Sequence, residues 1–385
     1  MVTTKWPYHG KPARGENTKG IGYLDWYIPR LKEKRKFDLS HSGLQFEWDF
    51  DSVIGEELSN IAKHHIIDKI DPREFIAQKE GVSKHRVVVT HGATQALQVA
   101  LLSVGHDIDQ DKIIAVESPS YAPVSQTANL LGYSTIPVHR NPPESGFGHW
   151  RIDKNEWSSV LEKASVLMFT PILNPVGWDL HPDDRNWIIQ TCEKNSVHII
   201  ADEVYSDSMA NHPDSVKIYD CGEHCISINS LTKVHGLGSI RFGWLIASES
   251  VAKQAQDVFR TVEGMISSPS VRLAKAVFDK LDQPVKKITE LREKNLPLLR
   301  HLLQSHGIDW NEPEYGVFGA FELPGERNSL EFVDNECAKE SLLAVPGCMF
   351  SENMKSWLRV AWSIEHEDFV KGIDALDKAL NRIAL

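Results

Sequence analysis

Short apolar runs alternate with stretches of helical periodicity between about residue 85 and residue 247. Regular alternation of this kind is typical of an α/β domain built on a mostly parallel sheet. Several of the runs are apolar at every position, as in VLMF and HIIA, which favours strands covered by helices on both faces. The pattern therefore predicts a central sheet of seven strands, at residues 87–90, 113–117, 134–138, 166–170, 198–202, 226–229 and 242–247.

The pattern changes after about residue 250. Long stretches of helical periodicity occupy residues 251–262 and 269–305, and shorter β-like pieces follow at 318–322 and 358–362. At 385 residues the chain also exceeds the roughly 300 residues at which single hydrophobic cores stop growing. These features indicate a second, smaller α+β domain.

The patterns divide the chain into three parts. We expect residues 1–42 to form an N-terminal segment that packs on the small domain, residues 43–265 to form the large domain, and residues 266–385 to form the small C-terminal domain. The N-terminal segment has an apolar face at helical spacing, formed by Tyr23, Leu24, Trp26, Tyr27 and Leu31. This spacing predicts a short helix that docks through its apolar side.

The composition argues against several classes of protein. Hydrophobic residues make up 41% and charged residues 25%, which is the mixture of an ordinary globular protein. The formal net charge of -11 repels nucleic acid and anionic lipid, and no run of about 18 apolar residues is available to span a membrane. We therefore expect neither a nucleic acid nor a membrane as partner.

The five cysteines form an odd set that contains no CxxC pair. The first 20 residues carry no apolar segment of the kind found in a secretory signal. We therefore expect reduced thiols, no metal and a cytoplasmic protein.

A lysine stands where ligands bind in α/β proteins. The segment SLTK, which ends in Lys233, follows the predicted strand at 226–229, and Arg241 lies eight residues beyond the lysine. Ligands of open α/β sheets bind at the carboxyl ends of the strands. A lysine there can condense with an aldehyde when burial or a neighbouring cation lowers its pKa. Taken alone, Lys233 would be expected to be a solvated lysine at a loop tip, because surface exposure is the norm for lysine.

Two other segments suit the ring of pyridoxal 5′-phosphate (PLP). The strand at 198–202 ends in Asp202, and Tyr205 follows three residues later. A carboxylate beside the pyridine nitrogen keeps that nitrogen protonated, which makes PLP an electron sink. Tyr205 and Asn174, the latter in the turn LNPVG, could both bind the phenolic oxygen of the ring. Each segment alone is also compatible with an ordinary turn or helix cap.

Two further strand ends provide residues that could contact a phosphate and a flat ring. Gly92, Ala93 and Thr94 form a glycine step between the strand at 87–90 and a helical run, and the N-terminus of a helix offers free N–H groups to a phosphate. Tyr121 follows the strand at 113–117 and could stack on a flat ring. Ordinary turn and core roles remain open for all four residues.

One arginine, Arg359, lies inside the strongly apolar segment WLRVAWS. Burying an unpaired guanidinium is very unfavourable, so the side chain needs an anionic partner. That partner is either an acidic residue in a structural salt bridge or the carboxylate of a substrate, which the fork geometry of arginine fits.

In order and spacing, these segments resemble the class I/II aminotransferases, the fold type I PLP enzymes similar to aspartate aminotransferase, over roughly residues 85–365. The resemblance implies the PLP-dependent transferase fold type I, an α/β architecture with a large domain and a smaller α+β domain. It implies that Lys233 forms the Schiff base with the cofactor and is the catalytic residue. Cofactor contacts are implied for Gly92, Ala93, Thr94, Tyr121, Asn174, Asp202, Tyr205, Ser230, Lys233 and Arg241. Substrate contacts are implied for Arg359, Asn174 and Gly43.

The chain departs from this family most clearly in one stretch. Many relatives carry a tyrosine that reaches the phosphate of the neighbouring subunit, whereas residues 63–68 of this chain read KHHIID. His64 or His65 could replace that tyrosine. Relatives usually form homodimers with the active site at the subunit interface, and the resemblance implies a homodimer here.

The resulting hypothesis is a PLP-dependent aminotransferase that moves an amino group from an L-amino acid to a 2-oxo acid. The alternative is another fold type I PLP reaction on an amino acid, such as β-elimination by a C–S lyase. A PLP-sensing regulator would need a DNA-binding module, which neither the first 40 residues nor the net charge leads us to expect. No second arginine can be assigned to a side-chain carboxylate, and the identity of the amino acid stays open.

Overall fold

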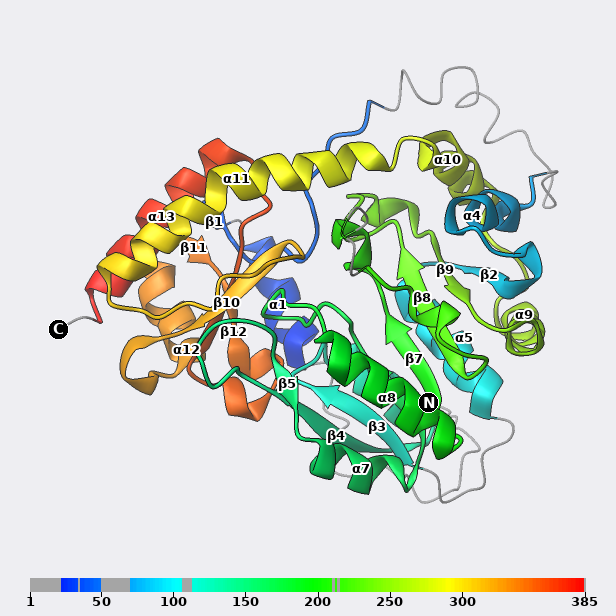
Figure 1. The fold of residues 1–385 in the computed structure, drawn as a ribbon. Helices are drawn as coiled ribbons and strands as arrows, with labels where there is room; N and C mark the ends of the chain where they lie inside the picture. Colours follow the sequence, from blue (N-terminus) through cyan, green and yellow to red (C-terminus); the bar gives the residue numbers. More distant parts are fainter. Residues whose placement is uncertain are drawn as a thin grey trace, which may run out of the picture.

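The computed structural model describes residues 22–33, 35–49, 70–105, 113–209, 212 and 215–383. Its largest feature is an eight-stranded sheet with the strand order β2-β9-β8-β7-β6-β3-β4-β5 (Figure 1). The strands are β2 (Val87–Thr90), β3 (Ile113–Ser118), β4 (Ser134–Asn141), β5 (Arg151–Ile152), β6 (Ala164–Phe169), β7 (His198–Asp202), β8 (Cys225–Ser230) and β9 (Gly243–Ile246).

All seven predicted strands of this sheet are present, and β5 is an eighth that the sequence did not predict. It is two residues long and pairs antiparallel with β4 at the edge of the sheet. So short a strand leaves no periodic pattern in a sequence. The pairs β3 with β4, β3 with β6, β6 with β7 and β7 with β8 are parallel, whereas β9 runs antiparallel to β2 and β8. The predicted, mostly parallel sheet is confirmed.

Helices cover both faces of this sheet because successive strand residues point to opposite sides. On one face Val88, Ile114 and Met168 pack under α5 (Ala93–Gly105), α6 (Pro123–Leu130) and α9 (Glu249–Val262). The opposite face is covered by α7 (Lys154–Leu161), α8 (Pro182–Lys194), α4 (Pro72–Glu80) and α10 (Ser268–Phe278). The strands are therefore buried on both sides, as their continuous apolar runs predict.

A second set of strands lies beside the half of the long helix α11 (Asp282–Ser305) that is distant from α10 (Figure 1). An antiparallel sheet has the order β10-β13-β12, and β1 pairs with β11 in parallel. The stretch predicted as one helix over 269–305 is two, α10 on the large sheet and α11 against α13. The remaining elements are β1 (Phe37–Asp38), β10 (Phe318–Glu322), α12 (Ser329–Glu331), β11 (Leu342–Leu343), β12 (Val345–Pro346), β13 (Trp357–Ala361) and α13 (His366–Asn381).

The N-terminal helix α1 (Gly22–Lys32) packs into the core of this second region. Tyr23 and Trp26 are buried there, and Arg30 forms an ion pair with Asp334 at 2.7 Å. The predicted helix is thus present, while the domain boundaries at residues 42 and 265 stay a prediction.

Within the described part of the chain, no helix combines the length and hydrophobicity needed to cross a bilayer. The five cysteines are free thiols. The described residues contain no group of three His, Cys, Asp or Glu side chains placed to hold a metal ion.

Candidate active site

A pocket opens between the carboxyl ends of the large sheet's strands and the second region of the chain. Its free space, measured to the mouth, is about 950 Å³, which is the size of a site for a cofactor and a small substrate. The wall brings together residues from β7, β8, α5, β13 and the segment after β1. The lining residues are Tyr23, Ser42, Ala93, Thr94, Leu97, Tyr121, Pro123, Val124, Thr170, Asn174, Asp202, Val204, Tyr205, Ile228, Ser230, Thr232, Lys233, Arg241 and Arg359.

Lys233 projects into this pocket from the loop that follows β8. Its Nζ donates a hydrogen bond to Ser42 Oγ at 2.8 Å and lies 5.9 Å from the centre of the Tyr121 ring. Burial lowers the pKa of Lys233 to about 8, and the positive charges of Arg359 and Arg241 act in the same direction. A substantial fraction of this amine is therefore neutral near physiological pH, as a nucleophile or base must be.

Asp202 ends β7 on the floor of the pocket. Its Oδ1 accepts a hydrogen bond from Val204 N at 3.3 Å. Burial raises the pKa of this carboxyl to about 6, while the hydrogen bond and the charge of Lys233 oppose the shift. A carboxylate at this depth gains from a cation placed against it, and the protonated nitrogen of a pyridine ring is such a cation. The site thus fits PLP at this residue.

Arg359 is buried in β13, and its guanidinium faces the pocket. Nη1 donates to Asn174 Oδ1 at 3.1 Å and Nη2 donates to Ser40 O at 2.8 Å, whereas Nε has no partner. Among the described residues, no acidic side chain forms an ion pair with Arg359. The salt-bridge interpretation therefore lacks a partner in this part of the chain, and the guanidinium retains N–H groups for an anion in the pocket.

Asn174 and Tyr205 reach the pocket with different hydrogen bonds already in place. The bond from Arg359 occupies Asn174 Oδ1, so the amide nitrogen of Asn174 is left to donate. The hydroxyl of Tyr205 donates to Ser42 O at 3.1 Å. Because a phenol has one proton, Tyr205 must release this bond before it can donate to a cofactor oxygen.

A buried ion pair holds the backbone that carries Asn174. Arg140 of β4 and Glu117 of β3 are both about fully buried, with Nη1 and Oε1 3.0 Å apart. Glu117 Oε2 accepts from Thr170 N at 3.0 Å, and Arg140 donates to the carbonyls of Thr170 and Pro171. The pair ties three segments together at the floor of the pocket, a role the sequence did not reveal.

The predicted phosphate-binding residues surround the start of α5. Ala93 and Thr94 begin the helix and line the pocket together with Ser230 and Arg241, and the N–H groups of a first helical turn have no partner within the helix. Gly92 has a φ of 95°, and a Cβ at this position would lie 2.5 Å from Arg241 Nη2. Arg241 Nη2 donates to His91 O at 3.2 Å. Helix N–H groups, a hydroxyl and a guanidinium together form a cradle suited to a phosphate.

Aromatic rings form the wall opposite Lys233. The Tyr23 ring lies 5.7 Å from that of Tyr121 and 6.0 Å from that of Phe350. Phe350 also packs on the Arg359 guanidinium, with 5.1 Å between Cζ and the ring centre. Tyr121 was predicted as a ring-stacking residue, whereas the place of Phe350 was not visible in the sequence, since tertiary contacts such as the bond from Ser120 N to Phe350 O bring these rings together.

The segment after β1 contributes Ser42 to the pocket wall. Gly43, the predicted substrate contact, instead packs against the backbone of the Lys233 loop, where a Cβ would lie 3.2 Å from Lys233 O. The substrate contact expected of Gly43 stays a prediction. His64 and His65 lie outside the described residues.

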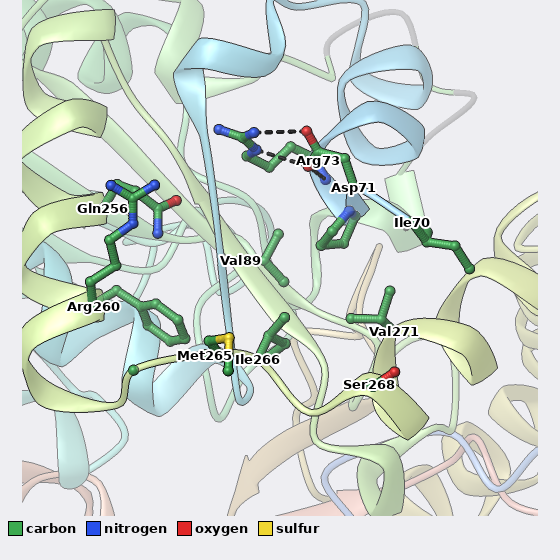
Figure 2. Close-up of a pocket in the computed structure, with 13 residues that line it drawn as sticks. Ile70, Asp71, Arg73, Val89, Gln256, Arg260, Met265, Ile266, Ser268 and Val271 are labelled. Carbon is green, nitrogen blue, oxygen red and sulfur yellow. Dashed lines mark hydrogen bonds and ion pairs between the residues drawn. The ribbon is translucent and has the colours of Figure 1, made fainter. Parts of the chain in front are cut away.

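A separate pocket opens where α4, α9 and α10 meet beside β2 (Figure 2). Its one carboxylate, Asp71, is paired with Arg73 through bonds of 2.8 and 2.7 Å, and Val89, Ile266 and Val271 make much of the rest apolar. Arg73 holds the pKa of Asp71 below its usual range. No amine lines this pocket within the described residues, so the chemistry expected from the sequence belongs to the pocket that contains Lys233.

Comparison with known proteins agrees with this geometry. A sequence model of the family described as "Aminotransferase class I and II" matches residues 66–376. The chain is 23% identical over 299 residues to the capreomycidine synthase of Streptomyces vinaceus, covering 77% of this chain and 75% of that protein. It is 20% identical over 322 residues to an aspartate aminotransferase of Sulfolobus acidocaldarius, covering 80% and 79%. The crystal structure of an aspartate aminotransferase from Thermotoga maritima superposes with a TM-score of 0.80 at 21% identity, covering 93% of this chain and 96% of that one.

Proposed function

The chain belongs to the aminotransferase class I and II family and is a PLP-dependent transaminase with the fold type I architecture, and we propose that Lys233 is its covalent cofactor anchor and catalytic base. One observation carries the assignment. The Lys233 amine, the Asp202 carboxylate and the Arg359 guanidinium line one pocket although they come from the loop after β8, from the end of β7 and from β13. These are the three charges that a reaction at the α-carbon of an amino acid requires.

Each charged group has a separate task in the proposed reaction. Arg359 binds the α-carboxylate of an L-amino acid with its remaining N–H groups and so fixes the orientation of the α-carbon. Lys233, partly neutral because its pKa is about 8, would take the α-proton onto Nζ as the general base. Asp202 keeps the ring nitrogen protonated. The cofactor itself supplies the electron sink for the pair left behind when the proton departs.

The remaining predicted residues bind the cofactor in this proposal. Ala93 and Thr94 offer N–H groups, Ser230 a hydroxyl and Arg241 a guanidinium to the phosphate. Gly92 is required beside them, because any side chain there would displace Arg241. The other expected cofactor contacts are a ring face from Tyr121 and hydrogen bonds to the ring oxygen from Asn174 and Tyr205. Asn174 and Gly43 are expected to contact the substrate as well.

We propose that the substrate has an uncharged side chain. The cations that line the pocket within the described residues are Lys233, Arg241 and Arg359, and each already has a task. Tyr23 and Arg359 both line the pocket, and Phe350 packs against the Tyr23 ring and the Arg359 guanidinium. We propose that the side chain of the bound amino acid lies on the Tyr23 side of the pocket. Apolar rings favour an apolar or aromatic side chain over a carboxylate, which would be desolvated there without a partner.

Two expectations from the sequence are kept as proposals. We propose a homodimer, supported by the exposed side chain of Met265, which is 46% accessible and lines the pocket of Figure 2, and by that of Val262, which is 50% accessible. We also propose a cytoplasmic location, supported by five cysteines that remain unpaired. Light scattering of the purified protein tests the first, and a single-chain mass would contradict it.

The function is tested by adding single amino acids, each with a 2-oxo acid, to the PLP-loaded enzyme and to the Lys233→Ala variant. We expect a new amino acid and a new 2-oxo acid in equal amounts from the wild type and no turnover from the variant. Release of ammonia with a 2-oxo acid would instead identify β-elimination, the alternative reaction on this scaffold. Turnover by Lys233→Ala at the wild-type rate would overturn the assignment of the base.

A further inference from the structure

The segment that follows β1 crosses the pocket and is held by three site residues. Ala361 N donates to Leu39 O at 2.7 Å, which attaches the start of the segment to the end of β13. Arg359 Nη2 donates to Ser40 O, Tyr205 donates to Ser42 O, and Leu44 N donates to Lys233 O at 2.8 Å. The backbone on both sides of residue 42 is therefore fixed relative to the substrate clamp and to the lysine loop.

This anchoring places one hydroxyl against the reactive amine. The distance from Lys233 Nζ to Ser42 Oγ is 2.8 Å, and no other hydrogen-bond partner of that amine is found among the described residues. Asp202 acts on Lys233 through its charge alone, since no direct hydrogen bond joins the two. Ser42 is half-buried and lines the pocket, so its hydroxyl faces the place where the substrate α-carbon must sit.

The chemistry of the base explains what a hydroxyl at this distance can do. When the α-carbon is deprotonated, the electron pair of the C–H bond stays with the substrate and the proton forms a new bond to Nζ, which becomes an ammonium. The amine must therefore direct its lone pair at the α-carbon and keep its N–H groups elsewhere. A hydroxyl oxygen that accepts one of those N–H groups fixes the rotation of the amine and stabilises the ammonium that forms.

We propose that Ser42 is a second catalytic residue, whose hydroxyl accepts a hydrogen bond from the Lys233 amine and directs its lone pair at the substrate α-carbon. This inference rests on the proposed role of Lys233 as the base. Ser42 remains beside the amine because the bond from Arg359 to Ser40 O and the bond from Leu44 N to Lys233 O hold the backbone on both sides of it.

Four variants separate this role from a structural one. Ser42→Ala and Ser42→Gly remove the hydroxyl, and the second covers the case in which the first does not fold. Ser42→Thr keeps a hydroxyl at the same position. Ser159→Ala is the matched control, because Ser159 lies in α7 and its hydroxyl donates to Glu156 O on the exposed side of the helix.

The first measurement is steady-state kinetics with protonated and α-deuterated substrate. We expect Ser42→Ala to lower kcat roughly tenfold to hundredfold, the range for one hydrogen bond to a charged group, with KM nearly unchanged. The isotope effect on kcat should rise, because proton transfer becomes slower relative to the other steps. Ser42→Thr should recover most of the rate, and Ser159→Ala should match the wild type.

The second measurement uses the protein without cofactor. The pH dependence of Lys233 acetylation by acetic anhydride, followed by mass spectrometry, reports the pH at which the amine becomes neutral. We expect Ser42→Ala to lower that midpoint, because the ammonium loses an acceptor. A serine that only shaped the loop would lower thermal stability and leave the midpoint unchanged.

An unchanged kcat, isotope effect and acetylation midpoint in both Ser42→Ala and Ser42→Gly would overturn the inference about Ser42. The proposed function would still stand in that case if Lys233→Ala remained inactive. Turnover by Lys233→Ala would overturn both. A loss confined to KM would also count against Ser42 as a catalytic residue, since it would indicate a contact made only in substrate binding.

Discussion

Replacing Arg359 tests whether the buried guanidinium is a substrate clamp. A guanidinium has five N–H groups, and in this structure the groups that donate to Asn174 and Ser40 are already in use. Nε and the outer N–H groups remain for a carboxylate. Two hydrogen bonds to a charged group contribute about 1.5–3 kcal/mol each, or about 3–6 kcal/mol together. At about 1.4 kcal/mol per tenfold, Arg359→Ala should weaken binding of an amino acid by roughly 10²–10⁴.

The assay must separate lost binding from disturbed folding, because Arg359→Ala also leaves Ser40 O and Asn174 without a donor. We would measure the Kd of an amino acid and of the amine that lacks its carboxylate, using the absorbance of the bound cofactor. Structural damage weakens the binding of both ligands, whereas loss of the clamp weakens the binding of the amino acid alone. The Kd of the amine divided by the Kd of the amino acid should therefore fall by roughly 10²–10⁴ in Arg359→Ala.

Two further variants control this experiment. Arg359→Lys keeps the charge but cannot form the fork, so it should recover the ratio only in part. Arg300→Ala removes an exposed arginine that pairs with Glu312, and it should leave the ratio unchanged. If the ratio in Arg359→Ala equals that of the wild type, Arg359 has a structural role and the clamp must be sought elsewhere.

Two predictions concern stability. The pKa of Asp202 lies at about 6, above the ordinary value of 3.8, so the cofactor-free protein should lose stability as the pH rises from near 4 to near 7. Asp202→Asn should lack this part of the loss. If the Tm of the two proteins changes equally with pH across this range, the prediction is wrong. Arg140→Met should destabilise the protein by about 3–5 kcal/mol because Glu117 becomes a buried, unpaired charge. Adding Glu117→Leu should restore most of that loss in urea unfolding, and a double variant no more stable than Arg140→Met would show that the pair itself is not the cause.

The strands and the chemistry at their ends could be predicted from the sequence. Continuous apolar runs are a local property, so all seven strands of the large sheet and its covered faces followed from the pattern. Parallel strands present their carboxyl ends at one edge of a sheet. Lys233 and Asp202, which end neighbouring strands, were therefore expected in one site, and the structure places both in the same pocket.

Contacts between distant segments were beyond the sequence. Ser42 and Lys233 are separated by 191 positions, and nothing in the pattern around either residue relates them. The ion pair of Glu117 and Arg140 could not be predicted for a similar reason, since the sequence around a charged residue in a strand does not indicate its partner. Strand β5 is too short to produce a periodic pattern in the sequence. The break between α10 and α11 depends on which part of the fold each helix packs against.

The sequence by itself determined the class of fold, the cofactor and the residue types of the site, because these depend on local periodicity and on motifs at strand ends. Only the tertiary structure decided the surroundings of those residues. Burial beside Arg359 and Arg241 sets the pKa of Lys233 at about 8, and the crossing segment after β1 provides its hydroxyl partner. Burial and the distance between charges are properties of the folded chain, and they determine whether a lysine at a strand end is an ordinary cation or a base.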